Sequence, residues 1–161
     1  MSKTIWKPGT VLYPVPAVMV SCGTLEKPNI ITIAWCGTLC TSPAMTYISV
    51  RPERFSYDII KQHKEFVINL TTEALAEATD FCGVKSGRDI DKFKETRLTA
   101  AKSNEVSAPS IAESPVNIEC RVKQIIETGG THDIFIAEVV SVSVDDKYFD
   151  ENGKFHFDKT K

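Results

Sequence analysis

The feature that most constrains the fold is a long β-hairpin predicted over residues 116–144. In its first strand, apolar and polar residues alternate from position 116 to position 123, the period-two pattern of a half-buried strand. Gly129 and Gly130 form the turn. The return strand, residues 133–144, is apolar on both faces, with Phe135, Ala137 and Val139 on one of them. We expect a barrel interior to cover the opposite face and a second copy of the chain to cover this one.

The remainder of the chain predicts more strands than helices. Strands are expected over residues 17–21, 29–35, 45–50 and 66–70, and helices over 54–62 and from about 71 to 83. Thr71 or Thr72 would cap the second helix, and Gly83 would end it. No βαβ rhythm or internal repeat is present, so the pattern predicts a mainly β protein, a β-barrel with helical insertions.

The middle segment, residues 83–115, has little sustained periodicity. It contains the apolar residues Phe93, Leu98 and Ile111, which a plain linker would lack. We therefore interpret it as a partly helical surface excursion. It is also the alternative cover for the exposed face of the return strand, within a single chain.

The length and net charge of the chain exclude several classes of function. The 161 residues predict one domain over 1–161, and 19 Lys+Arg against 21 Asp+Glu give a net charge of −2. Without a basic run, nucleic acid is not an expected partner. No apolar stretch approaches the roughly 20 residues of a membrane span, and no secretory leader opens the chain, so a cytoplasmic protein is expected.

Five cysteines and three histidines show no metal-ligand spacing. Cys36 and Cys40 are four residues apart, but no second pair completes a zinc site, and no C-x-x-C motif occurs. We predict no metal site, and we interpret most of the thiols as small buried apolar groups of a reducing compartment.

One segment could bind an anion. The chain has no glycine-rich phosphate loop and no G-x-S-x-G motif. At residues 49–56, however, a strand ends and a helix begins, and Ser49, Arg51, Arg54 and Ser56 lie beside the first N–H groups of that helix. From spacing alone, the plainer interpretation is favoured, in which Ser56 caps the helix and both arginines are solvated.

Four longer blocks resemble the flavin reductase-like family, and most of all its flavoredoxins. In chain order they are PNIITIAWCGTLCTSPAMTYISVRPERFSYDII, EFVINL, FCGVKSGRDIDKF and IAESPVNIECRV, within about residues 15–150. The resemblance implies an FMN-binding split β-barrel and a homodimer with one FMN per subunit near the interface. Family members usually continue beyond the turn at residues 150–153, so either the last segment is truncated or this member is short.

The resemblance also implies site residues. The flavin ring and ribityl chain would be lined by Asn29, Thr32, Ala34, Trp35 and Thr38, with Cys40 at the same wall. The phosphate would be held by Ser49, Val50, Arg51, Arg54 and Ser56. Lys92 and His132 would approach the flavin from loops. Taken singly, Trp35 could instead be a core residue, Asp89 or Asp91 could simply cap a short helix, and His132 could be an ordinary turn residue.

The implied activity is that of an NAD(P)H-dependent flavin reductase, an oxidoreductase that transfers hydride to flavin N5. No catalytic side chain is assigned; Lys92 is the candidate for a positive charge that stabilises the reduced flavin. The alternatives are a flavoredoxin-type electron carrier fed by a protein partner and a non-redox flavin-binding module. The sequence distinguishes neither NADH from NADPH, nor a tightly bound FMN from an exchangeable one, and it does not identify the electron acceptor.

Overall fold

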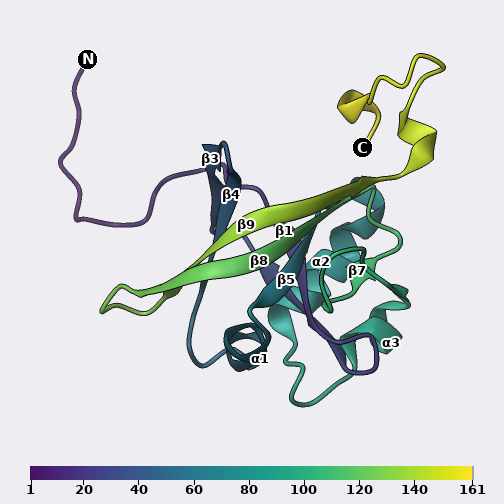
Figure 1. The fold of residues 1–161 in the computed structure, drawn as a ribbon. Coiled ribbons are helices and arrows are strands. Elements are labelled where there is room, and N and C mark those ends of the chain that lie inside the picture. The colour runs from purple at the N-terminus through teal and green to yellow at the C-terminus, as the bar shows by residue number, and fades with distance from the viewer. Residues whose placement is uncertain (161) are drawn as a thin grey trace.

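A single antiparallel sheet of seven strands organises the protein (Figure 1). The structure, a computed structural model, describes residues 1–160. The strands run in the order β2-β1-β5-β8-β9-β4-β3 and are β1 (Val18–Gly23), β2 (Pro28–Ile33), β3 (Cys36–Thr41), β4 (Ala44–Val50), β5 (Glu65–Asn69), β8 (Val116–Glu127) and β9 (Asp133–Val144). Strands β2 and β3 are the two edges and do not pair, so the sheet curls into a split barrel without closing. The mainly β fold with helical insertions is therefore confirmed.

Short helices fill the connections between the strands. They are α1 (Phe55–His63), α2 (Ala76–Val84), α3 (Lys92–Thr96) and the 3₁₀ turns η1 (Glu73–Leu75), η2 (Asp146–Tyr148) and η3 (Phe157–Lys159). Strands β6 (Ala100–Ala101) and β7 (Ser110–Ile111) form a separate two-stranded sheet. Within residues 1–160, no helix is long and apolar enough to cross a bilayer.

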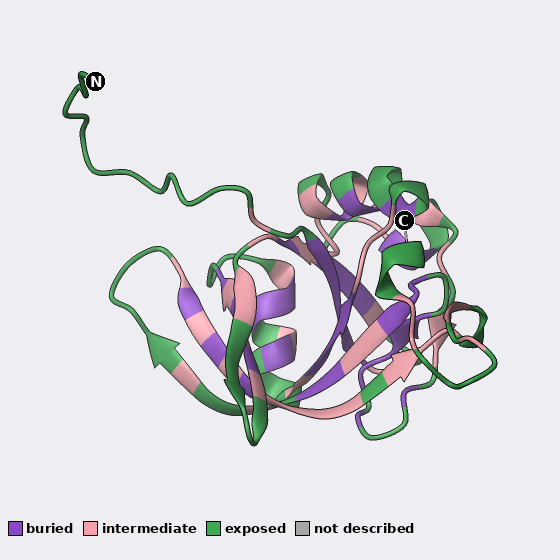
Figure 2. Cartoon of the chain, turned by 90° about the horizontal axis from the view of Figure 1, so that it is seen from above, coloured by how far each residue is buried: buried purple, intermediate pink, exposed green. Residues whose placement is uncertain are grey.

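Two apolar clusters make up most of the core. The larger fills the curled sheet and takes in the inner side of α1. The smaller lies between β1–β2 and the α2–α3 segment and includes Met19, Ile30 and Phe93. All six residues of β1 are buried because this strand is covered on both faces (Figure 2). The site described below lies where β2 meets these helices.

The expected orientation of β9 is wrong. Phe135 and Ala137 are fully buried in the larger cluster, and Val139 packs against it. The opposite face is the outer one, where Val140 packs against Val106 and Ala108 of the middle segment. A bulge at Val140 then turns Val142, which is 54% exposed, to the side of its partner Ile118, which packs against the larger cluster. Because both faces are apolar, the sequence lacks the alternation that decides which face points inward. The middle segment thus covers part of the outer face within one chain.

Three further differences from the sequence prediction concern β3 and α2. Strand β3 was not predicted, and α2 is entered through a 3₁₀ turn without a threonine side-chain cap. Gly83 does not end α2 but lies inside it, where an added Cβ would come within 3.3 Å of the Thr32 Cβ. This glycine therefore serves the close approach of α2 to β2.

The middle segment is the partly helical excursion that was expected. Phe93 and Ile111 are buried, and Leu98 packs against the smaller core cluster. Asp91 caps α3, its carboxylate accepting a hydrogen bond from the Lys94 N–H at 3.2 Å. The excursion is thus anchored to the sheet.

Candidate functional site

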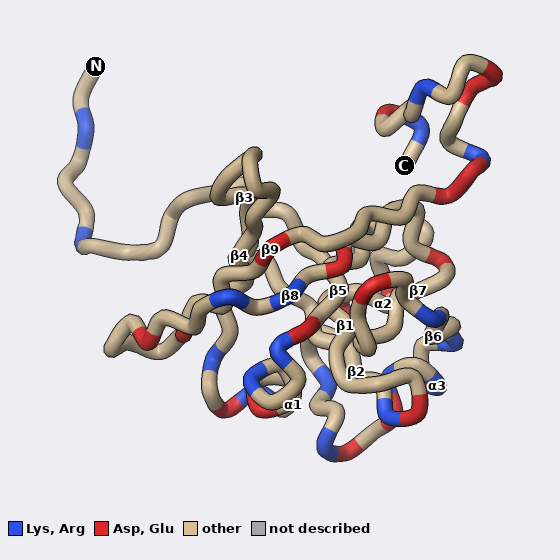
Figure 3. The backbone as a smooth tube through the Cα atoms, in the orientation of Figure 1, with Lys and Arg blue, Asp and Glu red and all other residues tan. Residues whose placement is uncertain are grey.

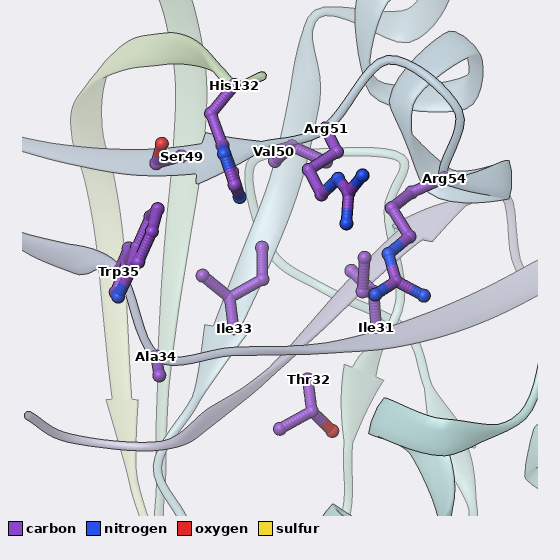
Figure 4. A pocket seen from close by; sticks show the side chains of 10 residues that line it. All are labelled: Ile31, Thr32, Ile33, Ala34, Trp35, Ser49, Val50, Arg51, Arg54 and His132. Atoms are coloured by element: carbon purple, nitrogen blue, oxygen red, sulfur yellow. The ribbon is translucent and has the colours of Figure 1, made fainter. Parts of the chain in front are cut away.

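Two adjoining cavities open along β2 beside the start of α1. The first, about 190 Å³, is lined by Ile31, Thr32, Ile33, Ala34, Trp35, Ser49, Val50, Arg51, Arg54 and His132 (Figure 4). The second, about 270 Å³, is lined by Ile31, Arg51, Glu53, Arg54, Phe55, Ser56, Lys92 and the segment from Cys82 to Arg88. Ile31, Arg51 and Arg54 line both, so the two form one elongated site.

The cationic part of the site is made where β4 gives way to α1. The Arg54 N–H donates to the Arg51 carbonyl at 3.0 Å, and Figure 4 shows both guanidinium groups directed into the same space. Arg54 is the residue that precedes α1, and no side chain caps this helix. Its first N–H groups therefore remain available to an anion, together with two arginines.

The opposite end of the site is aromatic. Trp35 follows β2 and His132 precedes β9, and their ring centroids are 4.6 Å apart. The Ser49 N–H donates to the Trp35 carbonyl at 2.8 Å, which fixes this end of β2 against β4. Burial and the neighbouring Arg51 lower the pKa of His132, so its imidazole favours the neutral form. Trp35 is 39% exposed and is not a core residue. His132 lies in the turn between β8 and β9.

Lys92 places a buried ammonium group at the second cavity. It is the first residue of α3 rather than part of a loop, and it is only 5% exposed. Its Nζ donates to the carbonyls of Ile30 at 2.8 Å and Cys82 at 2.7 Å. Burial lowers the pKa of Lys92 and raises that of the neighbouring Cys82 thiol to about 11. An ammonium has three hydrogens, so one remains for a ligand.

Asn29 and Ser56 join β2 to α1 beneath the site. The Asn29 Nδ2 donates to the Ser56 Oγ at 2.7 Å, and both side chains are buried. Ser56 is the second residue of α1, so it does not cap the helix as the plainer interpretation supposed. Asn29 lines neither of the two cavities but borders a third on the far side of Gly87.

Thr38 and Cys40 are not brought to these cavities. Both are exposed on edge strand β3, although the resemblance assigned them to the flavin wall. Cys40 also departs from the expectation of buried thiols, which holds for Cys22, Cys82 and Cys120. Within residues 1–160, no group of His, Cys, Asp or Glu is arranged to hold a metal ion.

The sequence reasoning missed the loop that follows α2. Ser86, Gly87 and Arg88 line the second cavity, and the Arg88 Nη1 donates to the Glu53 carbonyl at 2.9 Å. An added Cβ on Gly87 would lie 2.1 Å from the Asn29 Oδ1, so only glycine lets the loop lie this close to β2. The block FCGVKSGRDIDKF, which resembles the family, contains Ser86, Gly87 and Arg88, but only Lys92 of this block was predicted to lie at the site.

A model of the flavin reductase-like domain matches residues 10–159. The chain belongs to the flavin reductase-like family. The structure of flavoredoxin from Desulfovibrio vulgaris (Miyazaki F) is similar to it, with a TM-score of 0.89 and 29% identity over 99% of this chain and 85% of that one.

Two further relatives extend this comparison. The reductase component of the 4-nitrophenol 4-monooxygenase/4-nitrocatechol 2-monooxygenase of Rhodococcus opacus is 30% identical over 109 residues, 68% of this chain and 55% of that protein. An FMN-binding protein from Thermus thermophilus shares the fold at a TM-score of 0.80 and 19% identity, over 96% of this chain and 86% of that one. Family membership, the similarity to flavoredoxin and the similarity to the Rhodococcus reductase component support a flavin-linked redox function.

Proposed function

We propose that this protein is an FMN-binding oxidoreductase that reduces bound FMN with NAD(P)H. The observation that carries the proposal is the elongated site, which has two arginines and an uncapped helix start in the middle and an aromatic pair at one end. A cofactor that carries a phosphate and an aromatic ring matches a site with a cationic part and an aromatic end. The residues therefore fit FMN, and the flavin would supply the centre that accepts hydride.

The phosphate would be held at the start of α1. Arg51 and Arg54 would make charge-assisted hydrogen bonds to it, and the first N–H groups of the helix would donate as well. Ser56 Oγ accepts from Asn29, and the Ser56 side chain lines the second cavity. Asn29 would thus act as a positioning residue for Ser56.

The ring would lie at the aromatic end. Thr32, Ala34 and Trp35 come from β2 and its end, and His132 approaches from the β8–β9 turn. Lys92 lines the cavity of Ser56 and not that of Trp35. We therefore assign its positive charge to the phosphate end, rather than to the ring as the sequence reasoning had it.

We also propose that the protein is a homodimer. Apolar side chains stay exposed on three strands of the sheet, namely Leu39 on β3, Ile126 on β8 and Val142 on β9. Exposed apolar surface favours an interface with another chain. The commonest homo-oligomer is a dimer with two-fold symmetry. Thr38 and Cys40 lie outside their own chain's cavities, so they would meet a flavin only at such an interface.

Anaerobic mixing of the FMN-loaded protein with NADH or NADPH tests the activity. Rapid bleaching of the flavin absorbance, faster than for free FMN, is expected. The similarity to flavoredoxin favours a second candidate, an electron carrier, which would bleach only with dithionite or a reductase partner. A flavin that stays oxidised with every physiological donor would contradict both and indicate a non-redox module.

A further inference from the structure

Of the residues that line the first cavity, His132 is the one whose charge can change near neutral pH. Its imidazole is half-buried, and Figure 4 shows the ring directed into the cavity beside Trp35. The imidazole Nδ1 shares a hydrogen bond with the Thr131 hydroxyl at 2.9 Å. Because a hydroxyl can either donate or accept, the ring can take up a second proton without losing this bond.

The charged groups that face His132 come from the connection between β4 and α1. Arg51 and Arg54 line the same cavity, and Glu53 lies between them in the chain (Figure 3). The Arg51 Nη2 pairs with the Glu53 Oε1 at 2.5 Å. Burial lowers the pKa of His132 most, the two arginines lower it further, and Glu53 opposes them. Two positive charges against one negative charge therefore favour the neutral imidazole.

The other neighbours of His132 leave this balance to the connection. Asp133 follows His132 in the chain, but its carboxylate is buried and accepts a hydrogen bond from the Tyr57 hydroxyl at 2.6 Å. From the end of β2 the neighbour is the uncharged ring of Trp35, with the ring centroids 4.6 Å apart. An anion bound between Arg51 and Arg54 would therefore change the main charges that act on His132.

We propose that His132 is neutral in the free protein and takes up a proton when an anion binds at Arg51 and Arg54. A phosphate or sulfate dianion would offset both guanidinium charges and attract an imidazolium in the same cavity. Coupling of this kind is reciprocal, so the anion binds more tightly once His132 is protonated. The proposal rests on the proposed function only where it identifies the natural anion as the phosphate of a flavin.

Protonation would also strengthen the contact between His132 and Trp35. Their separation lies within the range over which a cation is attracted to an indole ring, so an imidazolium is held against Trp35 more firmly than a neutral ring. Anion binding in the middle of the site thus stabilises its aromatic end. Affinity for a dianion should rise as the pH falls from the pKa of His132 in the anion-bound protein to the lower pKa in the free protein.

The fluorescence of Trp35 provides the first test. The chain has two tryptophans, and Trp6 is 78% exposed, so Trp6→Phe leaves Trp35 as the reporter. An imidazolium beside an indole quenches its emission. The flavin-free protein is titrated with acid in sodium chloride and in sodium sulfate at equal ionic strength. We expect quenching with a midpoint below 6.5 in chloride and at least about 0.5 pH unit higher in sulfate. Equal midpoints would overturn the proposal.

Variants in the same background assign the signal. His132→Gln should abolish the quenching, and Arg54→Ala should remove most of the difference between sulfate and chloride. The control His63→Gln, at the last residue of α1, should keep both the quenching and the sulfate shift. Quenching that persists in His132→Gln, or a sulfate shift that Arg54→Ala leaves intact, would contradict the assignment.

Calorimetry with FMN separates this proposal from the proposed function. Binding is measured at pH 6.5 in two buffers of different ionisation enthalpy, which gives the protons taken up per FMN. Wild type should take up at least about 0.3 proton more than His132→Gln, since protonation of the phosphate itself is common to both. Equal uptake by two proteins that bind FMN would overturn the role of His132 alone. A sulfate shift in a protein that does not bind FMN would support this role and contradict the proposed function.

Discussion

The corner proposed to bind the phosphate, formed by Arg51, Arg54, Ser56 and Lys92 at the start of α1, differs from the outer sheet surface in how far one chain completes it. At the corner, Asn29 is bonded to Ser56, and Lys92 to two carbonyls. No buried side-chain nitrogen or oxygen in residues 1–160 lacks a partner. On the sheet surface, by contrast, Ile126 of β8 is 37% exposed and Leu39 of edge strand β3 is 50% exposed.

This difference distinguishes a site that one chain forms by itself from a surface that needs a second chain to cover it. Satisfied buried polar groups hold the corner in one arrangement before any ligand arrives, which favours binding. Exposed apolar groups gain nothing until another surface covers them. We infer that the phosphate end is preformed within one chain, whereas the ring end near β3 depends on a second copy.

The largest expected effect is at the corner. Arg54→Ala should weaken FMN binding by about 2 kcal/mol, because it removes a charge-assisted contact to the phosphate. Riboflavin, which has no phosphate, should bind nearly as before. Fluorescence titration of both ligands measures the effect, with Lys61→Ala at the other end of α1 as the control. Equal weakening of both ligands would contradict a phosphate role.

Gly87→Ala should destabilise the same corner by about 1–3 kcal/mol. The added Cβ would lie 2.1 Å from the Asn29 Oδ1 and 2.7 Å from the Phe55 Cδ1, so the loop must move away from β2. Urea denaturation measures the loss. The control Gly130→Ala meets nothing nearer than 3.5 Å and should change stability by less than about 0.5 kcal/mol. Similar losses in the two variants would show that packing at Gly87 is not the cause.

A smaller effect is expected at the contact that joins α1 to β9. The Tyr57 hydroxyl donates to the buried Asp133 Oδ2 at 2.6 Å, and this bond raises the pKa of Tyr57 to about 12 from 10.0. Tyr57→Phe should cost about 1 kcal/mol. Because the folded pKa is the higher one, the stability difference from wild type should be full below pH 10 and fall as the pH approaches 12. A difference that does not change with pH would contradict this assignment.

The smallest effect is expected on β3. Cys40→Ser changes an exposed side chain and should alter stability by less than about 0.5 kcal/mol. Reduction of bound FMN by NAD(P)H should persist, because no step assigned to this chain uses a thiol. Stopped-flow absorbance of the loaded variant checks this. Lost reduction with FMN affinity intact would make Cys40 a catalytic residue.

The same contrast explains what the sequence could predict. The hairpin strand over residues 133–144 was predicted with its observed bounds, because β-branched residues and a Gly-Gly turn mark it. Strand β3 was missed because CGTLCT is short, rich in small and polar residues, and paired only with β4. The inward face of β9 was misassigned because both faces are apolar.

The candidate site was only partly predictable for a similar reason. Arg51, Arg54 and Ser56 lie close in sequence, so local spacing could suggest an anion site. The contact between the tilted rings of Trp35 and His132 and the placement of Lys92 against Ile30 join residues 62 or more positions apart. The local spacing of the sequence does not predict such contacts. The resemblance to the family pointed to those residues, and the fold places Lys92 at the second cavity, which Ser56 also lines.

The central claim is that the corner at α1 recognises a phosphate on a flavin. Titration of the flavin-free protein with FMN and with riboflavin, followed by fluorescence, tests it directly. We expect FMN to bind more tightly by about 2–4 kcal/mol, because Arg51, Arg54 and the first N–H groups of α1 contact only the phosphorylated ligand. Equal dissociation constants for FMN and riboflavin would contradict the claim.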